Sequence, residues 1–189
     1  SRMIVSNEKN EEKMIELVKH IEKINSETQA WVDEDPKNRW GGMLVTDPEY
    51  WAESGIYTPE DFDKSSLAET IAQASKDATG SKYRIDWMDY TLEELQKEAD
   101  YWSKAAQSAI NEENEFKTKN AKKFETRIQD TIELGAGNRE TALRWILQAD
   151  DLLENPNYYN HGYASYSLNI PSYYNKELDG VIMGQKEAA

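Results

Sequence analysis

The chain has 189 residues and a formal net charge of −14, with 36 acidic residues against 22 basic ones. This acidic excess argues against direct nucleic-acid binding, because binding to phosphates requires a basic face. The absence of cysteine excludes disulfide bonds, thiol nucleophiles and thiolate metal sites. The apolar runs are too short to span a membrane, and the N-terminal residues lack a hydrophobic signal region. We therefore expect a soluble, intracellular protein in the cytoplasm, without a cofactor.

Apolar residues recur at spacings of three and four over most of the chain, which predicts helices. The first predicted helix covers residues 8–32, and Asp35-Pro36 ends it because proline disfavours a helical residue before it. Ser66–Glu69 is a capping-box pattern that predicts the start of a helix ending before Gly80. A second capping box, Thr91–Glu94, predicts the start of the next helix.

That next helix, over residues 92–134, is predicted to be unusually long. It contains no Gly or Pro and would measure about 64 Å at 1.5 Å per residue. Its apolar stripe is interrupted at Asn111–Asn114, so a kink or break there is an alternative. Gly135–Gly137 is expected to end the helix, since glycine tolerates the left-handed conformation. Asn138 is expected to cap a last helix over residues 139–153.

Residues 33–64 read as an acidic connector that is rich in aromatic residues. Asp47–Trp51 and Thr58–Phe62 are near copies in which a capping residue precedes Pro at the first helical position. They predict two short helical turns that pin the connector onto the helices with aromatic side chains. Between Glu27 and Asp63 there are ten acidic and two basic residues. This window is either a solvated face, a docking surface for a basic partner, or a mimic of nucleic-acid charge.

Residues 155–175 contain no charged residue, although they hold six of the eleven tyrosines. Tyr, Ser, Asn and Gly together are typical of binding loops, but we favour a strap that packs between helices, which could also line a pocket. Met43–Val45 and Val181–Met183 are the best strand candidates and are too short to carry a sheet. The prediction is therefore an all-α fold, an irregular helical bundle with one long helix and a Tyr-rich C-terminal strap.

We expect one helical domain over residues 1–189. Its predicted parts are the helix over 8–32, the connector over 33–64, a helical core over 66–154, the Tyr-rich segment over 155–175 and a charged tail over 176–189, which is expected to fray after residue 183.

Two functional hypotheses remain open. The first is a non-enzymatic interaction or assembly protein that binds a protein partner, or a second copy of itself, through Tyr and Trp surfaces. Six tryptophans in 189 residues favour it. The lysines of residues 117–123 could meet the acidic window of another copy. Nucleic-acid mimicry is less favoured, because basic residues are interspersed among the acidic ones over most of the chain.

The second hypothesis is an enzyme or binder of a small polar or anionic ligand, with a pocket lined by residues 139–174. Gly135–Arg139 places glycines and an arginine at a helix N-terminus, which attracts anions. His161 is the candidate for acid–base chemistry. The positions of the two histidines fit no metal motif, so no metal site is expected. The candidate ligand-binding residues are Arg139, Arg144, His161, Tyr158, Tyr159, Tyr163 and Tyr166.

The run ELGAGNRETALRWI over residues 133–146 resembles a stretch in uncharacterised small proteins of marine tailed phages. The resemblance covers about fourteen residues and contains no motif of known chemistry. It implies a phage-encoded protein of unassigned role that would act in the host cytoplasm. It assigns no function to any individual residue.

Overall fold

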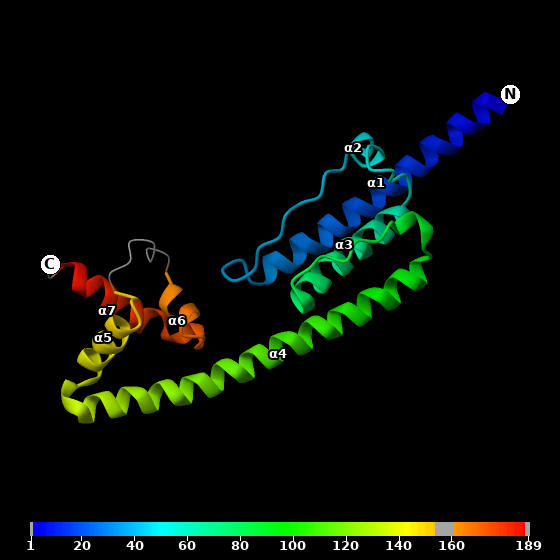
Figure 1. Ribbon diagram of the computed structural model, residues 1–189. Helices are drawn as coiled ribbons and strands as arrows, with labels where there is room; N and C mark the ends of the chain where they lie inside the picture. Colours follow the sequence, from blue (N-terminus) through cyan, green and yellow to red (C-terminus); the bar gives the residue numbers. More distant parts are fainter. Residues whose placement is uncertain (1, 154–160, 188–189) are drawn as a thin grey trace. The chain divides into compact units, whose positions relative to one another are not determined.

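A computed structural model describes residues 2–153 and 161–187, and this part of the chain contains helices and loops but no strand (Figure 1). The all-α prediction is confirmed. In chain order the elements are α1 (Arg2–Glu34), α2 (Pro48–Ala52), α3 (Pro59–Thr79), the 3-10 turn η1 (Trp87–Asp89), α4 (Leu92–Thr131), the π turn η2 (Ile132–Ala136), α5 (Arg139–Ala149), α6 (Tyr163–Ser167), the 3-10 turn η3 (Ser172–Tyr174) and α7 (Asn175–Glu187).

The chain divides into two compact units, residues 1–107 and 108–189, and α4 supplies residues to both. The core predicted over residues 66–154 is therefore shared out between them. Among the described residues, the first unit has two buried clusters, one around Leu17, Ile21, Ile56 and Phe62, the other around Ile71, Leu95 and Ala99. The buried cluster of the second unit is larger and joins α4, α5, α6 and α7. The expectation of a single folding domain stays a prediction.

Helix α1 ends at Glu34, where the Asp35-Pro36 pair predicts the stop, but it begins well before the predicted residue 8. The connector then runs back along α1 to the short helix α2 (Figure 1). Asp47 caps α2 as predicted by accepting a hydrogen bond from the Glu49 N–H. The predicted aromatic staples pack on each other, with the Trp51 and Phe62 rings 5.1 Å apart and edge to face.

The predicted start of the third helix at Ser66 is wrong, and so is the prediction that Thr58–Phe62 is only a short turn. Helix α3 already begins at Pro59. The Thr58 hydroxyl accepts from the Asp61 N–H, while the Asp61 carboxylate accepts from the Thr58 N–H. This reciprocal cap is reinforced by Pro59 at the first helical position, and no Gly or Pro follows within the helix. Ser66 therefore lies inside a helix that has already started.

The predicted ends of α3 and start of α4 are confirmed. Gly80, with φ +83°, is the C-cap of α3, and Thr91 and Glu94 exchange hydrogen bonds of 2.8 and 3.1 Å before α4. Helix α4 continues for 40 residues and passes through Asn111–Asn114 without a break, so the kinked alternative is wrong. These four residues are exposed. Because no packing is required of them there, loss of the apolar stripe does not end the helix.

The turn after α4 and the start of α5 are as predicted, whereas the end of α5 is not. Gly135 and Gly137 have φ of +127° and +78°, and the Asn138 side chain caps α5 at 2.9 Å from the Thr141 N–H. Helix α5, however, ends at Ala149 rather than at the predicted residue 153. Asp151 takes a positive φ of 56°, which turns the chain and buries Leu152 and Leu153.

The C-terminal region is helical as well. Val181 and Ile182, a strand candidate in the sequence, are buried on α7, which continues to Glu187 instead of fraying after residue 183. Tyr174 is buried with its ring edge-on to Phe124 of α4, at 5.4 Å, so the packing strap is confirmed for this tyrosine. None of the described helices is long and apolar enough to cross a membrane.

Candidate functional site

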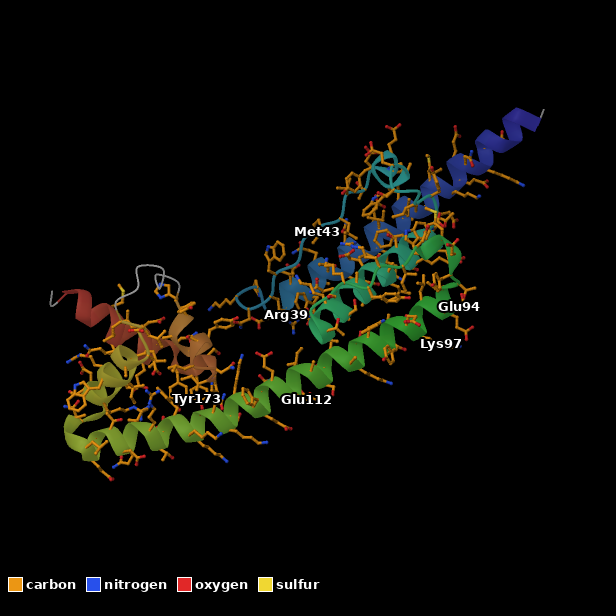
Figure 2. All side chains as sticks on the ribbon, in the orientation of Figure 1. Arg39, Met43, Glu94, Lys97, Glu112 and Tyr173 are labelled. Carbon is orange, nitrogen blue, oxygen red and sulfur yellow. The ribbon has the colours of Figure 1, made fainter. Side chains whose placement is uncertain are left out.

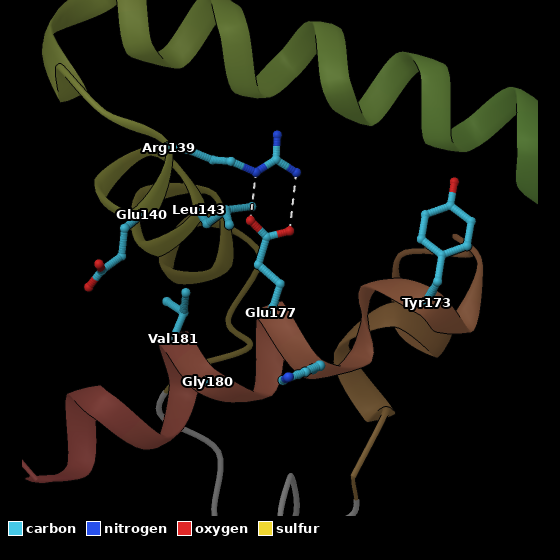
Figure 3. Close-up of a pocket in the computed structure, with 8 residues that line it drawn as sticks. Arg139, Glu140, Leu143, Tyr173, Glu177, Gly180 and Val181 are labelled. Atoms are coloured by element: carbon cyan, nitrogen blue, oxygen red, sulfur yellow. Dashed lines mark hydrogen bonds and ion pairs between the residues drawn. The ribbon is translucent and has the colours of Figure 1, made fainter.

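An open groove of about 730 Å³ lies between α5 and α7 in the second unit (Figure 3). Leu143 and Val181, both buried, make its apolar part. Charged residues of both signs surround them. The groove is lined by Arg139, Glu140, Leu143, Tyr173, Lys176, Glu177, Gly180 and Val181.

Arg139 joins three helices through two carboxylates. Its Nε and Nη2 atoms donate to Glu177 of α7 at 2.6 and 3.1 Å, the pair drawn in Figure 3. Its Nη1 and Nη2 atoms donate to Glu125 of α4 at 2.7 and 2.9 Å. The Tyr174 hydroxyl donates to the same Glu125 carboxylate at 2.7 Å. Such bidentate pairs are the strongest geometry available to an arginine and a carboxylate.

The network changes the acid–base properties of its members. Hydrogen bonds from Arg139 lower the pKa of Glu125 to about 2, with help from Tyr174 and against the opposing effect of burial. The same bonds, first to Glu125 and then to Glu177, raise the pKa of Arg139. Burial and the bond to Glu125 raise the pKa of the Tyr174 hydroxyl. At neutral pH Glu125 and Arg139 are therefore charged and Tyr174 is neutral, and all three guanidinium nitrogens of Arg139 already donate to the two carboxylates.

In the Glu125→Gln variant, the free energy of unfolding should fall less steeply at acid pH than it does in the wild type. The pKa of an unperturbed glutamate is about 4.3, so a folded-state pKa of about 2 gives stability that is present above pH 4.3. This stability is lost as the pH falls toward 2. Because the Glu125 side chain is 47% exposed, solvent screening limits the effect to about 1 kcal/mol.

Urea denaturation of both proteins, repeated at pH values from about 6 down toward 2, would measure this effect. Glu112→Gln, an exposed carboxylate on the same helix, is the matched control and should leave the fall at acid pH as it is. Parallel pH profiles for the wild type and Glu125→Gln would show that ionisation of Glu125 does not stabilise the folded state.

The other candidate residues from the sequence are not brought together at the groove. Arg144 pairs with Glu140 at 3.1 Å, one turn away on α5. The His161 side chain is 92% exposed, and its Nδ1 atom lies 3.4 Å from Asp179. Tyr163 packs partly buried against the core, whereas Tyr166 is exposed.

Tyr158 and Tyr159 lie outside the described residues. Of the predicted set, Arg139 alone among the described members lines the groove. A site in which His161 and both arginines converge on one ligand is therefore not the arrangement seen in the described part of the chain.

Sequence reasoning missed the partners of Arg139. Glu125 and Glu177 are separated from it by 14 and 38 residues, and each looks like an ordinary surface glutamate in the sequence. The signals at Arg139 itself, glycines and a helix N-terminus, predict anion binding. The prediction that Arg139 binds negatively charged groups is correct, but these groups are the carboxylates of Glu125 and Glu177 in the same chain.

A second candidate surface lies in the first unit, at residues 39–46, which we call the Trp40 segment. The segment has no helix or strand, and the Trp40 side chain is 85% exposed. Met43 and Val45 are also exposed, as is Tyr50 of α2 just beyond it. Arg39 and Met43 are labelled on this part of the chain in Figure 2. Large apolar side chains clustered at the surface mark interaction sites.

The Trp40 segment is held in place by specific contacts with its own unit. The Arg39 guanidinium lies 5.1 Å from the centre of the Trp31 ring and donates to the Trp31 carbonyl at 2.9 Å. The Asn25 side chain donates to the Leu44 carbonyl at 2.9 Å and accepts from the Leu44 N–H at 2.7 Å. The Trp51 indole donates to the Val45 carbonyl at 2.7 Å. Trp40 is therefore exposed on a segment that is anchored to its own unit.

Within the described residues, no group of three or more histidine, aspartate or glutamate side chains is placed to hold a metal ion. Comparison of the chain with family models, with curated proteins and with solved structures found no match.

Proposed function

We propose that the protein is a non-enzymatic interaction protein that binds a protein partner through the Trp40 segment. The observation that carries the proposal is the exposure of Trp40, Met43 and Val45 on an anchored segment of an acidic unit. Trp, Tyr and Met are enriched in the energetically important part of protein interfaces. Because these side chains gain apolar burial only when another molecule covers them, a partner accounts for their position.

The small-ligand hypothesis has less support. The groove between α5 and α7 has the volume of a ligand site. However, its arginine is neutralised by two glutamates, and neither His161 nor its partner Asp179 lines the groove. Nucleic-acid mimicry is also less favoured, since lysines pair with glutamates one turn away along α3 and α4. A phage origin and a cytoplasmic location remain predictions.

A comparison of tagged variants tests the proposal. Wild type, the double variant Trp40→Ser/Tyr50→Ser and the control Tyr166→Ser would each be incubated with a lysate of the cells that express the protein. We expect at least one protein to be retained by the wild type and the control but lost from the double variant, measured by quantitative mass spectrometry. Tyr166 is an exposed aromatic residue of the second unit, so it controls for general stickiness.

Identical sets of retained proteins for all three forms would refute a role for the Trp40 segment. A thermal shift produced by a metabolite, and abolished by Arg144→Ala or His161→Ala, would instead favour the small-ligand hypothesis.

A further inference from the structure

We infer that residues 40–45 of the Trp40 segment recognise an extended basic peptide of the partner. This peptide pairs with the main chain of residues 40–45. The inference rests on the proposed function and adds the chemistry of the partner. It follows from three observations on the first unit: free main-chain groups, exposed apolar side chains beside them, and an acidic surround.

The main chain of the segment offers hydrogen-bonding groups. In the described part of the chain, the N–H and C=O groups of Trp40 to Met43 make no hydrogen bond, whereas the next two residues are held by Asn25 and Trp51. A peptide that aligns with an open run of this kind gains main-chain hydrogen bonds, as in β-strand addition.

The segment is already ordered before a partner arrives. Gly41 packs so closely on α1 that a Cβ atom there would come within 2.5 Å of the Thr28 methyl group. Leu44 packs against the cluster of Leu17, Ile21, Ile56 and Phe62. Since these contacts fix the segment in advance, a peptide that pairs with it does not also have to order it, and binding costs less entropy.

The exposed side chains provide apolar contacts for alternate residues of a peptide. A Cβ atom at Gly42 would lie 3.7 Å from the Trp40 ring, an ordinary contact distance, so the ring lies close to the main chain of Gly42. Met43 and Val45 are exposed further along the segment. An aliphatic side chain of the peptide can therefore contact the Trp40 ring while its own backbone stays within reach of Gly42.

The charge around the segment selects a basic peptide. Acidic residues precede and follow it and outnumber the basic ones, since its own Arg39 is paired with Glu34 and held over Trp31 and Lys37 is the other basic residue between Glu27 and Asp63. After the segment, Asp47, Glu49 and Glu53 are exposed, and no basic residue follows before Lys64. Lysine or arginine in the peptide would be attracted, and acidic peptides or nucleic acid would be repelled. Added salt should weaken binding by screening these exposed charges.

Three blocked ten-residue probes separate these contributions. One alternates lysine with valine; a second alternates glutamate with valine; the third has the lysine–valine sequence with every peptide nitrogen methylated, which keeps the charge and the side chains but removes all backbone donors. Fluorescence polarisation would measure their affinities at two salt concentrations. Hydrogen–deuterium exchange, with and without the first probe, would locate binding on the main chain.

We expect the lysine–valine probe to bind about tenfold or more tightly than either of the others, with weaker binding at higher salt. Amide exchange should slow at residues 41–43. Trp40→Ala should lower the affinity about tenfold, while Tyr166→Ala should leave it unchanged.

Equal binding of the N-methylated probe, or protection elsewhere in the chain without protection at 41–43, would overturn the inference. So would failure of the lysine–valine probe to bind. The proposed function is judged separately: it fails only if the lysate comparison shows no protein that depends on Trp40 and Tyr50. A partner found there without a response to the basic probe would leave the interaction function standing and refute its assignment to an extended basic peptide.

Discussion

Leu178→Ala should lower the free energy of unfolding of the second unit by about 2–5 kcal/mol. Leu178 of α7 is fully buried in the cluster that also contains Phe124, Leu143 and Leu147. Removing its isobutyl group forfeits the transfer free energy of the lost atoms and leaves a cavity between helices. Urea denaturation followed by circular dichroism would measure the loss.

The matched control for this substitution is Leu134→Ala, in which the same atoms are removed from a side chain that is 84% exposed. It should change stability by less than about 0.5 kcal/mol. Equal effects of the two substitutions would mean that the buried cluster around Leu178 does not hold α7 in place.

Leu95→Ala should produce a loss of similar size, about 2–5 kcal/mol, in the first unit. Leu95 lies on α4, is fully buried with Ile71 and Ala99, and has Trp87 and Trp102 packed against its cluster. Leu92→Ala, one turn earlier on the same helix and 38% exposed, is the control and should cost much less. Because Leu and Ala have similar helix propensities, the difference between the two variants reports burial rather than helix stability.

Together these two substitutions test whether the chain is one folding domain. Each buried cluster in the described residues draws its members from a single unit, so we expect each substitution to accelerate amide exchange mainly in its own unit. Faster exchange across both units after either substitution would support the single domain predicted from the sequence, with α4 as the element that couples them.

Much of the helical architecture could be predicted because its signals are local. Gly80, Thr91 with Glu94, and Asn138 each act on backbone groups within one turn, and each caps a helix where the sequence indicates. The error at Ser66 has the same origin. Two capping patterns lie within one stretch that can be helical, and local rules do not say that the earlier one at Thr58 starts the helix.

The candidate site was far less predictable, because its properties depend on residues that are distant in the sequence. Arg139 looks like an anion-binding residue until Glu125 and Glu177 approach it from two other helices. Trp51 packs on Phe62, whereas Trp40 is left at the surface, and neither outcome can be read from the residues next to Trp40. Helix periods and caps are properties of the chain within a few residues, whereas ion pairing and burial depend on which faces the tertiary structure places against each other.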